Sequence, residues 1–430
     1  MVPDPDPPTV GRRALLAGAG AALVAATGVV GAVQPTALPD TLTDQASKYL
    51  PEPTDHRWHP PVSEAHARDT VGELAKEVER GRELWAELDT DERFGGAGGW
   101  LESAREELRA GNYHEATFYA TGGMQFAAED VGIALARLGR PAADPDRLAE
   151  RGEAIRDRAD DLVADIGDYP VVDAGRDLGW YHDIERWVVI VRLDAHERDP
   201  DSDREYDEPD DVGALHAGNR QAELRLATAE HYREQLRDRI GDGGEPTVDR
   251  IARLNDRFRD GIEEYPDSVE IRERLEAVRE EHGDGPYTLA RRKLATWCFD
   301  NDHVVTDWKS DLTLVQTVEA AQMLTNRRAH DRALEALVVD PADDGFDSGH
   351  VVREKRAAMR EFRRVVGNDP APLLSILTER AGEDIDVAEV GFAGSYERPL
   401  WRDRVEAYCY ALIGRTKLQA YPRVYERVVE

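Results

Sequence analysis

Cysteine is almost absent from this sequence, which has two cysteines in 430 residues. Cys298 and Cys409 each stand among apolar neighbours, so we interpret them as buried, unreactive thiols. The alternative is a single disulfide between them, which becomes chemically permissible if the body of the protein lies outside the cytoplasm. No pair has the spacing of a zinc finger or of a dithiol redox motif, which excludes both kinds of site.

Lysine is scarce as well, because the sequence has only Lys48, Lys76, Lys293, Lys309, Lys355 and Lys417. All other cationic side chains are arginine, and 87 acidic residues outnumber 55 basic ones to give a net charge of -32. A surface of this charge repels nucleic acid and anionic lipid headgroups, so we exclude nucleic acid as a partner.

This composition, with few lysines and abundant Asp, Glu, Ala, Val and Gly, resembles that of proteins from salt-loving archaea. The resemblance implies adaptation to high salt. At multimolar salt the Debye length falls to about 3 Å or less, which screens the repulsion within the chain. In dilute buffer the same chain feels its own charge, and we expect it to be less stable there.

Long hydrophobic runs are missing except at residues 14–33, ALLAGAGAALVAATGVVGAV, which contain no charge. As a helix this run would span roughly 30 Å, enough to cross a bilayer. The preceding string Gly11-Arg12-Arg13-Ala14-Leu15-Leu16 resembles a twin-arginine signal, with Arg12 and Arg13 as the targeting pair. The resemblance implies export of a folded protein. The positive-inside tendency then leaves the arginines in the cytoplasm and the body outside.

The fate of this segment stays open, since Val30-Gly31-Ala32 is an acceptable cleavage site but not a clean one. Residues 1–33 are therefore either a signal or a membrane anchor. We expect the protein at the cell membrane with an extracellular body, or secreted if the signal is cleaved. The expected partners are the cell membrane, through the N-terminal helix, and another protein.

The rest of the chain divides by composition. Residues 34–62 contain six prolines and are predicted to be a tether. Residues 199–211 are strongly acidic and contain Pro200 and Pro209, so we interpret them as a solvated linker. Their alternating acidic residues lack the central glycine and terminal glutamate of a calcium-binding EF-hand. The linker would separate a helical half at 63–198 from another at 212–430.

Strand-like alternation is nearly missing, whereas apolar residues recur with helical period in almost every segment. We predict an all-α fold of antiparallel helical hairpins or bundles after the N-terminal segment. Residues 108–120 contain a Gly-Asn-Tyr turn between two helical stretches and resemble one tetratricopeptide-like hairpin, without further copies at a fixed period. The other predicted helices cover about 71–88, 146–165, 170–197, 212–240, 247–264, 267–282, 286–300, 311–338, 349–366, 371–380 and 399–427.

The candidate site is the string Gly179-Trp180-Tyr181-His182-Asp183-Ile184-Glu185-Arg186-Trp187. His182 and Glu185 are three residues apart and share one face of a helix, as metal ligands do in helical bundles. The string resembles the Gly-x-His-x-x-Glu motif of imelysin-like exported helical proteins, with one extra residue after Gly179. The simpler alternative is an amphipathic helix that turns Trp180, Ile184 and Trp187 inward. We interpret His56 and His59, which stand between prolines, as a coincidence in a loop.

Signatures of common enzymes are missing, including HExxH, a nucleophile elbow, a Walker loop and a Rossmann fingerprint in a fitting context. No cofactor is therefore predicted, and an enzyme is the less favoured expectation. The first hypothesis is an exported, membrane-tethered helical scaffold or interaction protein. The second is a helical metal- or solute-binding protein of the cell envelope, and the third is an unrecognised hydrolase.

Overall fold

The computed structural model describes residues 35–53, 57–88, 90, 94–95, 97–195, 208–300, 311–391 and 400–430. Over these ranges the protein is all-helical and has no strand, with one isolated bridge between Val171 and Glu245. The all-α prediction is confirmed. The predicted signal or anchor, with Arg12 and Arg13, and most of the acidic linker lie outside the described residues. No helix within the ranges is both long and apolar enough to span a membrane.

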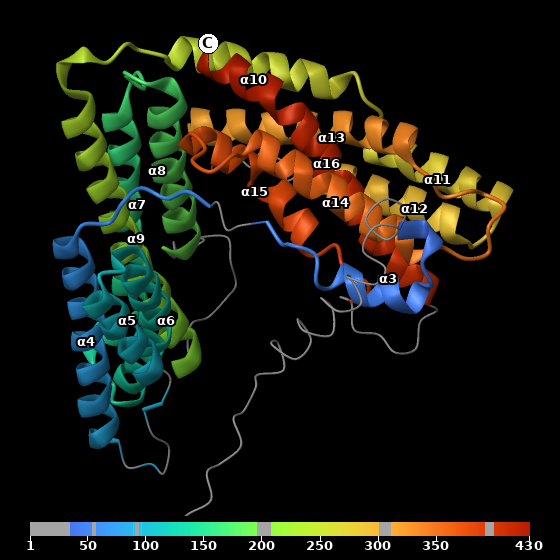
Figure 1. Ribbon diagram of the computed structural model, residues 1–430. Coiled ribbons are helices and arrows are strands. Elements are labelled where there is room, and N and C mark those ends of the chain that lie inside the picture. The colour runs from blue at the N-terminus through green and yellow to red at the C-terminus, as the bar shows by residue number, and fades with distance from the viewer. Residues whose placement is uncertain are drawn as a thin grey trace, which may run out of the picture.

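The helices form two bundles that lie side by side (Figure 1). In the first bundle, α6 packs on α4, α5 and α9, and α9 also packs on α7 and α8. Its helices are α4 (Glu64–Glu87), α5 (Gly98–Ala110), α6 (Tyr113–Arg137), α7 (Pro145–Ile166), α8 (Ala174–Asp194) and α9 (Pro209–Ile240).

In the second bundle, the long C-terminal helix packs mainly against α12, α13, α14 and α15 and occupies the centre. The helices are α10 (Val248–Glu263), α11 (Ser268–His282), α12 (Pro286–Ala295), α13 (Thr313–Ala336), α14 (Ser348–Val365), α15 (Pro372–Asp386) and α16 (Leu400–Val429). Both cysteines are buried here as free thiols, as predicted, and burial raises the pKa of Cys298 to about 12. The two bundles meet where α8 packs on α13 and α15.

Local sequence signals set the ends of many helices. The side chain of Ser63 accepts a hydrogen bond from the backbone N–H of His66 and caps α4, and Asp267 caps α11 in the same way. Gly111, with a φ of 81°, ends α5 in the left-handed conformation that suits glycine. The turn predicted within residues 108–120 therefore joins α5 to α6 as an antiparallel pair.

The crossing of α6 and α9 depends on two facing glycines. A Cβ atom at Gly132 would lie 2.8 Å from the Cα of Gly213 and 2.9 Å from the Cβ of His216. The two backbones thus approach more closely than a larger side chain would allow. This close approach helps to fix the angle at which α9 crosses the first bundle.

The chain passes from the first bundle to the second after the acidic linker, not at it. Pro209 begins α9, and the buried side chains of α9, among them Leu226 and Tyr232, face α6 and α8 of the first bundle. The chain passes to the second bundle only after Ile240, at the 3-10 turn η3 (Gly241–Gly243). Residues 212–240, which the sequence assigned to the second half, therefore belong to the first bundle.

The proline-rich segment also departs from the prediction. It begins with the 3-10 turn η1 (Pro35–Ala37) and the helix α3 (Asp40–Ser47), which both pack on α14. Proline is well tolerated at the start of a helix, where a backbone N–H would lack a partner, and Pro39 stands at the N-cap of α3. Residues 35–47 are therefore part of the second bundle rather than a tether. Residues 57–62, here called the strap, then run from the junction of the bundles back to α4 across the first bundle (Figure 1).

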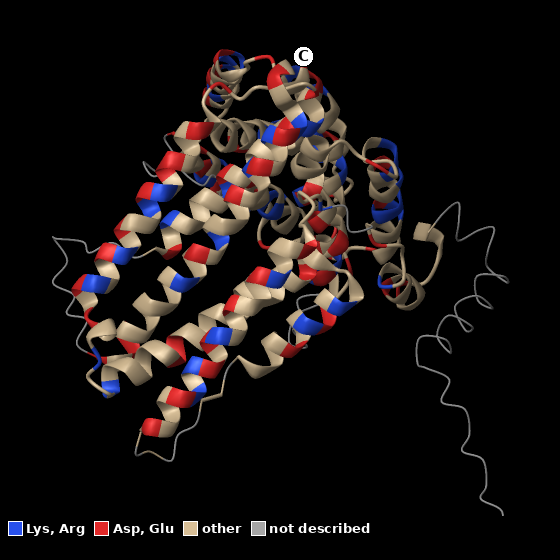
Figure 2. Cartoon of the chain, turned by 90° about the vertical axis from the view of Figure 1, so that its left-hand side faces the viewer, with Lys and Arg blue, Asp and Glu red and all other residues tan. Residues whose placement is uncertain are grey.

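Acidic and basic side chains are interspersed along the helices (Figure 2). Several form pairs one turn apart on the same helix, such as Arg68 with Glu64 on α4 and Arg274 with Glu270 on α11. Exposed pairs of this kind contribute little to stability, typically about 0.3–0.5 kcal/mol, and salt screens them. The charged surface therefore matters more for solubility than for holding the fold.

Candidate functional site

The predicted site residues lie on α8, a helix that is buried on most of its surface. The side chain of Asp173 accepts a hydrogen bond from the backbone N–H of Arg176 and so caps its N-terminus. Trp180 and Ile184 point into the core, as the amphipathic alternative predicted, and each is at most 1% exposed. Trp187 instead lines a cavity.

Glu185 joins α8 to the second bundle. Its carboxylate accepts a hydrogen bond from the Tyr169 hydroxyl and others from the backbone N–H of Val315 at 2.6 Å and of Leu314 at 3.4 Å. These N–H groups lie in the first turn of α13, so Glu185 caps that helix from another bundle. Burial raises the pKa of Glu185 to about 7, although its hydrogen bonds favour the charged form.

His182 takes no part in this cap and lines a cavity. Its Nδ1 is buried and has no hydrogen-bond partner in the described chain. Burial lowers the pKa of His182 to about 4, so the ring is neutral at pH 7. Nowhere in the described ranges do three or more His, Cys, Asp or Glu side chains gather to hold a metal ion. The pair His182 and Glu185 is thus divided between a cavity and a helix cap, and no third ligand from the described part of the chain joins it.

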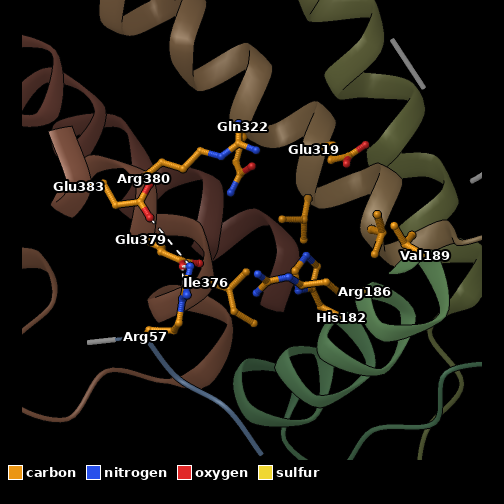
Figure 3. A pocket seen from close by; sticks show the side chains of 12 residues that line it. Arg57, His182, Arg186, Val189, Glu319, Gln322, Ile376, Glu379, Arg380 and Glu383 are labelled. Carbon is orange, nitrogen blue, oxygen red and sulfur yellow. Dashed lines mark hydrogen bonds and ion pairs between the residues drawn. The ribbon is translucent and has the colours of Figure 1, made fainter. Parts of the chain in front are cut away.

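The cavity at His182 lies between α8, α13 and α15 and has a volume of about 270 Å³ (Figure 3). We call it the junction cavity. His182 and Arg186 enter it from α8, whereas Arg380 extends from α15 toward Gln322 of α13. Arg57 of the strap also lines it and forms an ion pair with Glu379.

A larger cavity, of about 550 Å³, lies between the strap and α6, α8 and α9, and Arg186 lines it as well. We call it the α6–α8–α9 cavity. It has an apolar wall of Phe118, Trp187, Ile190 and Tyr232. Its charged and titratable lining side chains are Arg57, His59, His114, Glu115, Asp183 and Arg186. Arg57 and Arg186 line both cavities, so the two cavities adjoin each other at these side chains.

Two histidines from distant segments stack in the larger cavity. The rings of His59 and His114 have centroids 4.4 Å apart and are nearly parallel, at 19°. His59 Nδ1 also lies 3.8 Å from Asp183 Oδ1. Burial lowers the pKa of His114, and the neighbouring His59 lowers it further. A protonated ring at His114 is therefore disfavoured, and this side chain offers a neutral hydrogen-bonding group at pH 7.

Asp183 and Arg186 complete the polar wall. Asp183 is 3% exposed, and its Oδ2 accepts no hydrogen bond from the described residues. Arg186 is half-buried and has neither an ion pair nor a hydrogen bond to any described residue. A half-buried guanidinium without a partner is unfavourable, because it loses contact with water and gains no compensating charge.

Sequence reasoning found α8 but missed the partners that meet it. His59 comes from the strap and had been interpreted as a coincidence in a loop, and His114 comes from the first turn of α6. These residues share no spacing motif with Asp183 and Arg186, so no local signal could have joined them. Only the packing of the strap, α6 and α8 brings them to one cavity.

The fold and site thus define an all-helical protein of two bundles with cavities at their junction. Two family models match the chain, and both are described as domains of unknown function. One, DUF8262, matches residues 65–242, and the other, DUF8264, matches residues 248–430. They correspond to the first and second bundles, and they meet where the packing changes. Neither the curated proteins nor the solved structures include a significant match to the chain.

Proposed function

We propose that the protein binds a small solute carrying an anionic group, which Arg186 holds at the boundary of the two cavities. The observation that carries this proposal is the unpaired, half-buried guanidinium of Arg186, which lines both spaces. Arginine presents five N–H donors in a fork that fits a carboxylate or a phosphate. A bound anion would supply the charge that the guanidinium lacks.

The size of the cavities supports a small ligand. Ligand sites commonly have volumes of about 300–1,000 Å³ and combine apolar walls with a few convergent polar groups. The α6–α8–α9 cavity, at about 550 Å³, lies within this range and has both kinds of wall. Binding of a solute is therefore better supported than a scaffold role, which no specific surface of the described chain favours.

The test is isothermal titration calorimetry of the purified full chain, in multimolar KCl with mild detergent. The probes are hexanoate and L-leucine, which both carry a carboxylate. Replacing Arg186 with Gln should weaken binding of each bound probe at least about tenfold, since a hydrogen bond to a charged group contributes roughly 1.5–3 kcal/mol. Arg105→Gln, on the exposed face of α5, is the matched control. Binding that is equal in both variants would refute the role of Arg186.

We also propose that the body is exported and stays at the cell membrane or is released from it, in a high-salt environment. The support lies in the sequence: Arg12 and Arg13 precede the apolar residues 14–33, and the net charge is -32. A solute-binding body outside the cytoplasm would meet its ligand directly. Replacement of the two arginines and variation of salt test these proposals separately.

A further inference from the structure

Asp183 and Arg186 carry opposite charges one turn apart on α8, yet they do not pair with each other. Side chains three residues apart on a helix are neighbours, and opposite charges at this spacing normally attract. Both residues line the α6–α8–α9 cavity, and no ion pair joins them. The one ion-pair neighbour of Asp183 among the described residues is His59, at 3.8 Å. The wall thus presents a separated negative and positive group to the same space.

We infer that the α6–α8–α9 cavity binds a zwitterionic amino compound with an apolar side group, such as an apolar α-amino acid. This inference rests on the proposed function and specifies its ligand. The ligand carboxylate would meet the guanidinium of Arg186, and the ligand ammonium would meet the carboxylate of Asp183. Helical neighbours are about 5–6 Å apart at Cβ, which suits the short separation of the two charges in an α-amino acid.

Charge balance favours this class over simpler ions. A plain carboxylate would satisfy Arg186 but would bring a second negative charge next to the buried Asp183. A plain amine would satisfy Asp183 but would leave Arg186 without a partner. Since a buried charge without a partner is costly, the cavity discriminates against both. Only a ligand with both charges neutralises both side chains.

Apolar lining residues supply a place for an apolar side group. Trp187 and Ile190 follow Arg186 on α8, and Phe118 of α6 lines the same cavity. Phe118 is 58% exposed, an unusual position for a large aromatic side chain. An apolar group between these residues would cover part of this surface, and burial of apolar area favours binding.

The test uses calorimetry on the full chain to compare three compounds that share one side group and differ in their charged groups. The probes are L-leucine, N-acetyl-L-leucine, which lacks the ammonium, and 3-methylbutylamine, which lacks the carboxylate. L-phenylalanine, N-acetyl-L-phenylalanine and phenethylamine form a second series for a larger side group. In at least one series the amino acid should bind about tenfold tighter or more than either partial form.

Two variants test the contributions of Asp183 and Arg186 to binding separately. Asp183→Asn should weaken binding of the amino acid about tenfold or more and leave binding of its N-acetyl form equal or tighter. Arg186→Gln should weaken both forms, whereas Asp157→Asn, an exposed change on α7, should alter neither. Circular dichroism and the melting temperature check that each variant is folded.

The outcomes distinguish this inference from the proposed function. If the N-acetyl form or hexanoate binds as tightly as the amino acid and depends on Arg186, solute binding stands and the zwitterion inference is overturned. If an amine binds and does not depend on Arg186, both fail. If no probe of either series binds, the inference is overturned, and hexanoate then decides the proposed function by itself.

Discussion

The carboxylate of Glu185, on α8 of the first bundle, accepts a 2.6 Å hydrogen bond from the backbone N–H of Val315 in the first turn of α13 of the second bundle. Glu185 lies within one helical turn of both Asp183 and Arg186. The residue that caps a helix of the second bundle is therefore on the same short segment as the proposed ligand site. Helix α8 thus connects the bundle junction directly to the cavity.

Replacing Glu185 with Gln should change how stability depends on pH. The pKa of Glu185 is raised from 4.5 to about 7, so the folded state favours its protonated form. Its stabilising contribution is fully present below pH 4.5 and is lost as the pH rises through about 7. Relative to the variant, the wild type should lose roughly 3 kcal/mol between pH 4.5 and 8, measured by urea unfolding. Glu150→Gln, an exposed change on α7, is the control for the loss of one acidic side chain. A difference between the wild type and Glu185→Gln that stays constant with pH would show that the pKa of Glu185 is not raised.

The buried ion pair of Lys417 and Asp384 should respond very differently from exposed pairs. The Nζ of Lys417 lies 2.8 Å from Asp384 Oδ2, and the two side chains are 3% and 7% exposed. Lys417→Met would leave Asp384 charged and buried, so it should lower the free energy of unfolding by about 3–5 kcal/mol. The double variant with Asp384→Leu should recover most of this loss. Lys76→Met, which breaks an exposed pair with Glu73, should cost under about 1 kcal/mol. Equal effects at both sites, by urea unfolding, would mean that Lys417 is not buried as described.

Gly349→Ala should disturb the docking of the N-terminal segment. A Cβ atom there would lie 2.5 Å from the Cα of Thr36, so η1 would have to move. We expect a loss of about 1–3 kcal/mol in a chain that contains residues 35–50. In a chain that begins at residue 51 the clash partner is gone, and alanine within a helix should instead stabilise by up to about 1 kcal/mol. A loss of the same size in both chains, measured by urea unfolding, would contradict the packing of η1 on α14.

The net charge of -32 predicts a strong effect of salt. Thermal unfolding of residues 35–430 should shift to higher temperature as KCl rises from dilute to multimolar. Salt screens repulsion between the acidic side chains and strengthens the burial of apolar groups. Circular dichroism at a series of KCl concentrations gives the measurement. A melting temperature that stays flat across the series would refute adaptation to high salt.

The targeting pair can be tested in cells. Replacing Arg12 and Arg13 with Lys keeps both charges but removes the twin-arginine pattern. The precursor should then remain in the cytoplasm, because recognition of this signal depends on the arginines themselves. Cell fractionation and immunoblotting give the distribution, with the unchanged protein as the control. Equal export of both proteins would exclude this route.

The sequence by itself determined where the helices lie. Apolar residues at helical spacing, side-chain caps such as Ser63 and Asp267, and the glycine at 111 act within a few residues of the chain. Such local signals are strong enough to fix the class of fold and most helix ends. The same logic failed at residues 35–47, because prolines that begin a helix look in sequence like prolines that prevent one.

Only the tertiary structure decided which faces meet and which charges stay unpaired. His59, His114, Asp183 and Arg186 come together because the strap, α6 and α8 pack around one cavity. The angles of that packing depend on contacts between distant residues, such as Gly132 with Gly213. Whether a charge on α8 finds a partner depends on the side chains that other helices bring to it. The spacing of residues along a single helix carries no information about those neighbours.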